Sequence, residues 1–164
     1  MAMQLSDILD PRHIVLDLTG STKREVLAQL AAPIVETHPS LDHDKLVDVL
    51  VRREETSTTA IADGIAIPHG KMILGEEVIA GFGRSREGID FESVDGNPTH
   101  LFFLLVSPES HPSLHLRWLA HLAVLLKSSE LRQQLLDANT AEEVLAALAR
   151  EERARSESQP DAAK

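Results

Sequence analysis

Hydrophobic residues recur at helical spacing in two segments of the first third of the chain. Thr22 and Glu25 have the spacing of a capping box, which favours a helix start there. A second helix is predicted to begin after Asp42. The apolar faces of the two helices consist of Val26, Leu27, Leu30, Ile34, Val35, Leu46, Val47, Leu50 and Val51. Pro33 lies inside the first helix and is expected to kink or end it, because it lacks an N–H.

Short apolar runs between these segments predict strands. Residues 13–18 alternate, residues 78–84 are apolar with two glycines, and residues 64–67 read Gly-Ile-Ala-Ile. Residues 99–106 are almost continuously apolar, which is typical of a strand covered on both faces. Strands interleaved with helices indicate an α/β fold, here a single domain with a mixed β-sheet flanked by helices on both sides. The pattern leaves the strand order open.

The last third of the chain is predicted to be helical, over about residues 112–126, 130–136 and 140–149. Thr140 and Glu143 form a second capping-box pattern. From about Arg150 the chain has almost no apolar residues, so residues 151–164 are expected to be a disordered tail. The predicted domain therefore spans residues 1–150.

Composition excludes several classes of protein. With 26 acidic and 16 basic residues among 164, the net charge is −10, which argues against nucleic acid as a partner. The chain has no cysteine, which excludes disulfide scaffolds, iron–sulfur clusters and thiol nucleophiles. It shows no signal-peptide pattern and no apolar run of about 20 residues, so we expect a cytoplasmic protein without membrane insertion.

The segment from Gly64 to Lys71, Gly-Ile-Ala-Ile-Pro-His-Gly-Lys, is the most informative for chemistry. Pro68 restricts the backbone, and Gly70 leaves room for a ligand, so His69 is expected at the point where a buried strand reaches a loop. The glycine spacing and the residue after Lys71 do not fit a nucleotide-binding phosphate loop. A turn that happens to contain a histidine would look the same.

A neutral imidazole is nucleophilic near pH 7 and can accept a phosphoryl group covalently. Such a group needs positive charge and hydrogen-bond donors, which Arg53, Thr58 and Thr59 could supply. Taken alone, Arg53 is more typical of a cation at a helix C-terminus, and the two threonines are more typical of a polar loop or an edge strand.

His111 and His115 stand four residues apart, a spacing that could place two zinc ligands on one helix face. Pro112 stands where the zinc protease motif has glutamate, and no third ligand is evident. We therefore expect no metal and no cofactor, although a metalloenzyme remains an alternative.

The residues from Arg53 to Lys71 resemble the enzyme IIA domain of the sugar phosphotransferase system, fructose/mannitol type, nitrogen-regulatory branch. The resemblance rests on Arg-Glu, on Thr58-Thr59, and on Gly-Ile-Ala-Ile-Pro-His ending at His69. The order of elements from about residue 5 to residue 148 fits as well. Ala60 and Ala62 depart from the family pattern, which commonly has glycine at these positions.

The resemblance implies a phosphocarrier. His69 would accept a phosphoryl group from an HPr-type phosphocarrier protein, and His115, Arg53 and Thr59 match the other active-site positions of the family. Expected further partners are regulatory proteins or a IIB domain. The resemblance favours a free-standing regulatory protein. The alternatives are a sugar-specific IIA subunit and an interaction module without phosphorylation. Whether the chain is an enzyme in its own right is left open.

Overall fold

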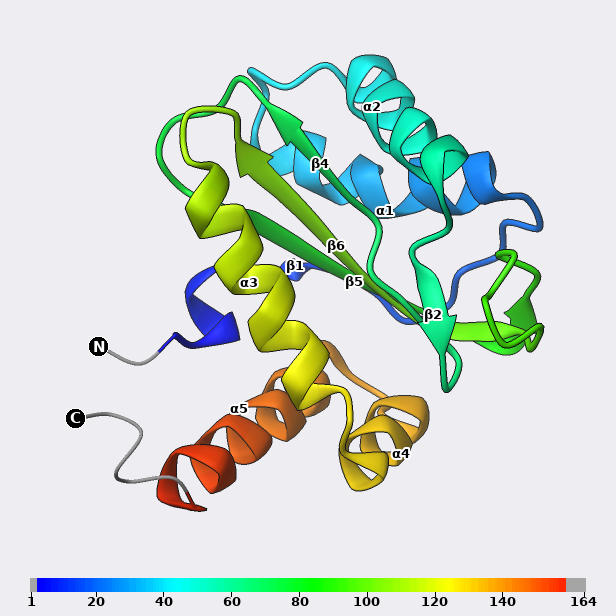
Figure 1. The fold of residues 1–164 in the computed structure, drawn as a ribbon, viewed down its shortest axis with the longest axis vertical. Helices are drawn as coiled ribbons and strands as arrows, with labels where there is room; N and C mark the ends of the chain where they lie inside the picture. Colours follow the sequence, from blue (N-terminus) through cyan, green and yellow to red (C-terminus); the bar gives the residue numbers. More distant parts are fainter. Residues whose placement is uncertain (1–2, 159–164) are drawn as a thin grey trace.

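The computed structural model describes residues 3–158 and forms one α/β domain (Figure 1). The strands are β1 (Leu9–Val15), β2 (Ala60–Ala62), β3 (Ile65–Ala66), β4 (His69–Met72), β5 (Ile79–Ile89) and β6 (Thr99–Pro108). The helices are a short 3-10 turn, η1 (Leu5–Asp7), and α1 (Lys23–Thr37), α2 (His43–Thr56), α3 (Pro112–Leu125), α4 (Ser129–Asp137) and α5 (Ala141–Ser158). The predicted fold class, a mixed sheet with helices on both faces, is confirmed.

The strand order in the described residues is β1-β5-β6-β3-β2, with β4 also paired to β6. β5 and β6 are antiparallel, as are β2 and β3, whereas β1 runs parallel to β5, and β3 and β4 run parallel to β6. Ile65 pairs with Leu101, and His69 pairs with Leu105, so β3 and β4 keep the same offset of 36 residues along β6. The two strands are thus one interrupted strand in a constant register.

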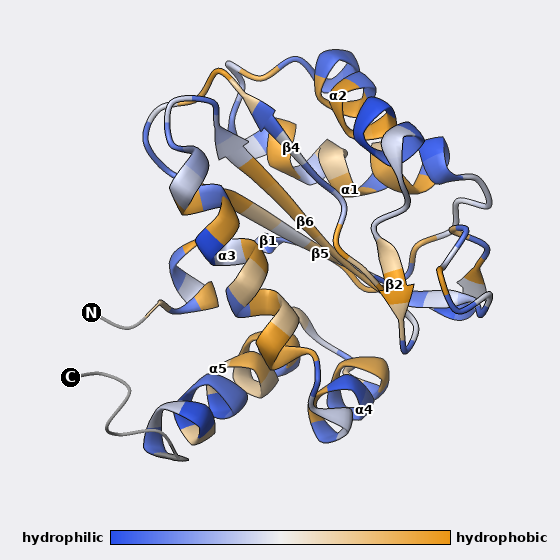
Figure 2. Cartoon of the chain, viewed as in Figure 1, coloured by the Kyte–Doolittle hydropathy of each residue, from blue (hydrophilic) through white to orange (hydrophobic). Residues whose placement is uncertain are grey.

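Two apolar cores lie on opposite faces of the sheet. Helices α1 and α2 pack over one face, and α3, α4 and α5 pack over the other (Figure 1). On β6, Phe102 and Leu104 face the first core, whereas Phe103 and Leu105 face the second. The alternation follows from the two-residue period of a strand, and it explains why β6 is continuously apolar from Leu101 to Val106, the orange part of the strand in Figure 2.

Three local predictions differ from the structure. The first strand spans Leu9–Val15 instead of residues 13–18, and it contains Pro11. Proline is tolerated there because β1 is an edge strand. Helix α1 continues past Pro33 to Thr37, with Ile34 fully buried beyond the proline. His69 begins strand β4 rather than lying in a loop.

The predicted tail also differs, because α5 continues to Ser158. Glu152 holds this part of the helix to the domain: its Oε2 accepts hydrogen bonds from the backbone N–H of Leu5 at 2.9 Å and from His121 Nε2 at 2.6 Å. The scarcity of apolar residues after Arg150 could not reveal that hydrogen bonds of Glu152 hold this part of the helix to the domain. Residues 159–164 of the predicted tail lie outside the described residues.

Candidate functional site

His69 stands where β4 begins, immediately after the interruption that Pro68 makes between β3 and β4. Its backbone is fixed by the ladder to β6, where Pro68 O accepts from Leu105 N at 3.0 Å. Gly70 points to the opposite face, where an added Cβ would lie 2.7 Å from Val49 of α2. The glycine in this segment is therefore required by packing against α2, and not by the ligand that the sequence suggested.

The hydrogen bonds of His69 define which ring nitrogen carries the proton. Nδ1 lies 2.8 Å from the carbonyl oxygen of Ile67, which can only accept, so Nδ1 donates. The Nε of Arg53 lies 3.1 Å from Nε2 of His69, and arginine can only donate. Nε2 therefore holds the free electron pair, which is the nucleophilic position of the ring.

Arg53 comes from the last turn of α2 and is itself held in place. Its Nη1 donates to the carbonyl oxygen of Ser57 at 2.9 Å, just beyond the end of the helix. One guanidinium group thus ties the imidazole to the segment that follows α2. The prediction that Arg53 and His69 share a site agrees with this contact.

His115 lies one turn into α3 on the other side of His69. The two ring centroids are 5.1 Å apart and the ring planes are inclined by 56°. Nδ1 of His115 lies 2.5 Å from Oγ of the buried Ser107 on β6, and the imidazole is only 4% exposed. Ser107 therefore sets the orientation of the second imidazole.

Both imidazoles of the site are held neutral. Burial lowers the pKa of His69; its hydrogen bond to Ile67 opposes this shift, and the positive charge of Arg53 adds to it. Burial also lowers the pKa of His115, to about 4, with further contributions from His69, Lys71 and Arg53. Near pH 7, His69 is accordingly an unprotonated nucleophile in a cationic surrounding.

Lys71 is an exposed cation of this site that sequence reasoning did not single out. It follows His69 by two residues on β4, so both side chains leave the same face of the sheet. Its charge contributes to the lowered pKa of both imidazoles. The strand predicted from the sequence ends at residue 67, so its two-residue period does not extend to Lys71.

Thr59, the fourth predicted site residue, is not brought to the imidazoles. Its hydroxyl and its backbone N–H both bind the carboxylate of Glu54, a buried residue that sequence reasoning did not select. Ala60 and Ala62 lie in β2, and the positive φ angles nearby belong to Asp63 and Gly64. Alanine is therefore unstrained at both positions where the family pattern has glycine.

His111 stands at the N-cap position of α3, where its side chain makes no capping hydrogen bond. Among residues 3–158, no group of three or more His, Cys, Asp and Glu side chains is arranged to hold a metal ion. Over the same residues, no helix is long and apolar enough to cross a membrane.

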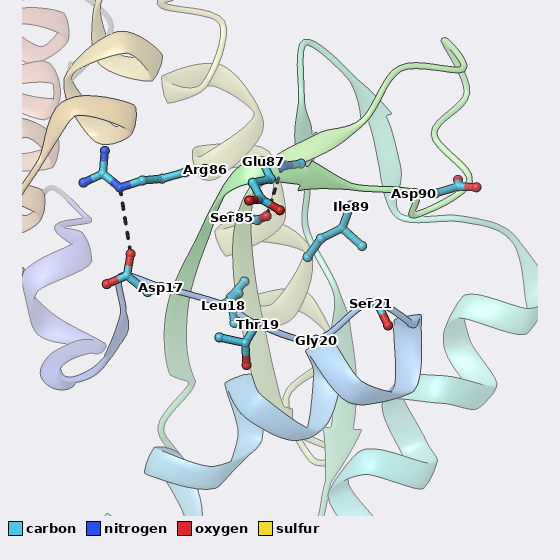
Figure 3. Close-up of a pocket in the computed structure, with 11 residues that line it drawn as sticks. Asp17, Leu18, Thr19, Gly20, Ser21, Ser85, Arg86, Glu87, Ile89 and Asp90 are labelled. Atoms are coloured by element: carbon cyan, nitrogen blue, oxygen red, sulfur yellow. Dashed lines mark hydrogen bonds and ion pairs between the residues drawn. The ribbon is translucent and has the colours of Figure 1, made fainter.

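A hollow of the surface lies away from these residues. It has a volume of about 480 Å³ and is lined by residues 17–21 and 85–90, where Arg86 Nε is 3.8 Å from an oxygen of Asp17 (Figure 3). None of the predicted site residues lines it. The candidate site around His69 is therefore identified by its reactive side chains and not by the size of a cavity.

The site holds a neutral imidazole whose unprotonated nitrogen faces a guanidinium group. It lies on a mixed sheet between two helical layers, and this combination is that of a protein with a nucleophilic histidine. Residues 7–151 match the family model of the phosphoenolpyruvate-dependent sugar phosphotransferase system, EIIA 2. The chain belongs to this family.

Relatives of two kinds are similar to the chain. It is 36% identical over 147 residues to a nitrogen regulatory protein of Bradyrhizobium diazoefficiens, covering 90% of this chain and 95% of that protein. It is 32% identical over 143 residues to the fructose-specific EIIABC component of Bacillus subtilis, covering 87% of this chain but only 22% of that protein. The crystal structure of nitrogen regulatory protein IIA-Ntr from Neisseria meningitidis superposes with a TM-score of 0.81 at 33% identity, covering 88% of this chain and 98% of that one.

Proposed function

We propose that this chain is a phosphocarrier of the phosphotransferase system that accepts a phosphoryl group on Nε2 of His69 and acts as a regulatory protein in the cytoplasm. The observation that carries the proposal is the fixed tautomer of His69, whose free electron pair at Nε2 faces Arg53. Family membership supports the phosphocarrier role, and the nitrogen regulatory relatives support the regulatory one.

The transfer step follows from this geometry. Nε2 attacks the phosphorus of a phosphohistidine on the donor; the new N–P bond forms as the donor's N–P bond breaks, and the donor imidazole keeps that electron pair. The proton on Nδ1 stays in place, and the carbonyl of Ile67 stabilises the positive charge that develops on the ring. The proposed donor is an HPr-type protein.

Arg53 has two tasks in this step. It must first release Nε2, because a nitrogen bonded to phosphorus cannot accept a hydrogen bond. Its guanidinium can then bind the phosphoryl oxygens with two parallel N–H groups. His115 and Lys71 add a donor and a charge on the other side of His69. The group thus arrives among cationic or donating side chains, as transfer requires.

The test is to incubate the protein with an HPr-type protein, enzyme I and phosphoenolpyruvate and to locate the label by mass spectrometry under alkaline conditions. We expect one acid-labile phosphate on His69, none in His69→Ala, and slower labelling in His115→Ala. His43→Ala, at the first residue of α2 and so at the opposite end of that helix from Arg53, should behave as the unsubstituted protein. Phosphate retained by His69→Ala would refute the assignment.

A sugar-specific IIA subunit is the second candidate, because the chain is similar to part of a fructose-specific component. The two candidates differ in the acceptor. Rapid and complete transfer from labelled His69 to a fructose-type or mannitol-type IIB domain would favour the transport role. A label that stays on the protein in the presence of such domains would favour regulation.

A further inference from the structure

Glu54, the neighbour of Arg53 on α2, occupies a position where the helix pattern calls for an apolar residue. It lies four residues after the buried Leu50, and its side chain is only 2% exposed. A carboxylate is costly to bury unless its oxygens are occupied by donors. The contacts of Glu54 therefore indicate why it is there.

Thr59 donates two hydrogen bonds to this carboxylate, one from its hydroxyl and one from its backbone N–H. The hydroxyl of Thr59 donates to Oε1, and the backbone N–H of Thr59 donates to Oε2 at 3.1 Å. Lys23, at the start of α1, supplies the counter-charge with its Nζ 3.6 Å from Oε2. The same Nζ lies 5.1 Å from the ring centroid of Phe91, which limits its freedom. Thr59 is thus fastened to the end of α2.

From Thr59, backbone hydrogen bonds lead to the nucleophile. The carbonyl of Thr59 accepts from the N–H of Ile67 at 3.2 Å, and the carbonyl of Ile67 accepts from Nδ1 of His69 at 2.8 Å. The segment between α2 and Thr59 also contains Ser57, whose carbonyl holds Arg53. Both partners of the His69 ring therefore depend on where Thr59 is fixed.

We infer that Glu54 and Thr59 form a clamp that keeps His69 in its Nδ1–H tautomer and aims Arg53 at Nε2. They are positioning residues, because neither side chain touches the imidazole or the transferred group. The effect on transfer rests on the proposed function, whereas the effect on the tautomer does not. The clamp also gives Thr59, predicted from sequence as a site residue, a different role from the one implied by the resemblance.

The test compares Glu54→Gln and Thr59→Val with the unsubstituted protein. The amide introduced by Glu54→Gln places a donor where Thr59 needs an acceptor, and valine keeps the shape of threonine without its hydroxyl. Two-bond ¹H–¹⁵N spectra of the imidazoles report the tautomer of His69 in the absence of any donor protein. We expect a single Nδ1–H tautomer in the unsubstituted protein and a mixture in both variants. Phosphoryl transfer should slow by roughly 10- to 100-fold, as for a small misplacement of a reacting group.

Three further variants control the experiment. Thr59→Ser restores the hydroxyl and should restore both tautomer and rate. Glu55→Gln removes the same charge from the exposed neighbouring position and should change neither. Thr59→Ala replaces Thr59→Val if the valine variant does not fold, as judged by circular dichroism.

The outcomes separate the clamp from the proposed function. An unchanged tautomer and rate in folded Glu54→Gln and Thr59→Val would overturn the clamp. Failure of every clamp variant to fold, beside a folded Glu55→Gln, would also overturn it, because the two residues would then be structural only. The variants could shift the tautomer while even the unsubstituted protein accepts no phosphoryl group. That result would support the clamp and refute the phosphocarrier role.

Discussion

At the scale of single residues, the arginine of the site does more than supply charge. Arg53 uses Nε for His69 and Nη1 for Ser57 at the same time. Lysine keeps the charge but has one compact ammonium group, which cannot reproduce this planar arrangement. The geometry of the guanidinium is thus the property to test.

We expect Arg53→Lys to fold normally and to accept the phosphoryl group at a rate lower by about 10²-fold, the usual cost of one donor to developing charge. The rate is measured by quenched flow with a phosphorylated HPr-type donor. Arg52→Lys, an exposed neighbour on α2, is the matched control and should show the unsubstituted rate. An undiminished rate for Arg53→Lys would reduce Arg53 to a cation at the helix end.

The buried imidazole of His115 predicts how stability varies with pH. Its pKa is lowered to about 4 in the folded protein, so the unfolded chain binds a proton first as the pH falls. The contribution of the neutral His115 to the free energy of unfolding is therefore fully present above about pH 6.5 and is lost progressively as the pH falls to about 4. The loss amounts to about 3 kcal/mol at the lower limit.

The measurement is urea unfolding between pH 7.5 and 4.5 for the unsubstituted protein and for His115→Gln. We expect the free energy of unfolding to fall less steeply in the variant, since glutamine does not titrate in this range. Parallel curves would show that His115 is protonated as readily in the folded as in the unfolded protein.

His69, Arg53 and His115, which the family resemblance assigned to one site, meet in the structure. Of the three, only His69 stood in a motif whose residues alone indicated a reactive position. Sequence reasoning missed Glu54 and Ser107, whose roles depend on contacts between elements. Glu54 could have been noticed as an acidic residue in the apolar stripe of α2. Ser107 carries no such signal, since a serine at a strand end is ordinary. Thr59 was selected, but its hydroxyl points to Glu54.

At the scale of elements, the C-terminal helix is fastened to the domain by a charge and not only by apolar packing. Glu152 joins α5 to α3 through His121 and to the N-terminal turn through Leu5, which is completely buried. The apolar contacts of α5 lie earlier, around Val144 and Leu148. The end of the helix is polar, as its blue colour in Figure 2 shows.

We expect Glu152→Ala to lower the free energy of unfolding by about 1–3 kcal/mol, because it leaves the buried N–H of Leu5 without an acceptor. Thermal and urea unfolding measure this loss. Glu157→Ala, at an exposed position of the same helix, should change stability by less than about 0.5 kcal/mol. Equal stability of the two variants would show that the anchor contributes nothing.

At the scale of the whole molecule, a buried cation joins the sheet to the helical layer of α3, α4 and α5. Arg84 of β5 is 1% exposed. Its Nη1 donates to the carbonyls at the end of α4, those of Leu135, Leu136 and Ala138, and its Nε donates to Leu16 at 3.2 Å. The negative end of a helix dipole thus takes the place of a carboxylate partner.

We expect Arg84→Met to destabilise the protein by about 3 kcal/mol, since the side chain fits but several buried carbonyls lose their donor. Acceptance of the phosphoryl group should persist below the new melting temperature, because Arg84 does not contact His69. Arg86→Met, an exposed position on the same strand, is the control and should cost less than about 1 kcal/mol. A stable Arg84→Met protein would show that the helix end needs no cation.

The fold class and most elements could be predicted because each depends on local periodicity. Helices α1 and α2 begin within a residue or two of their predicted caps, and Thr22 and Asp42 do accept the expected backbone N–H groups. Strand order could not be predicted, because the pairing of β1 with β5 depends on contacts distant in sequence. Helix α5 was predicted too short for the same reason, since its anchor joins residues 147 positions apart.

The constant register of β3 and β4 along β6 determines on which face of the sheet the reactive residue His69 lies. Side chains alternate between the two faces of the sheet, so parity alone places His69 and Lys71 toward α3 and Gly70 toward α2. Deleting one residue between Ala66 and His69 would reverse that parity. The imidazole would then point at Val49, where even one methyl group lies too close, and a glycine would face His115. The number of residues between the two strands therefore decides which face of the sheet carries the imidazole, and two residues are the number that keeps the register constant.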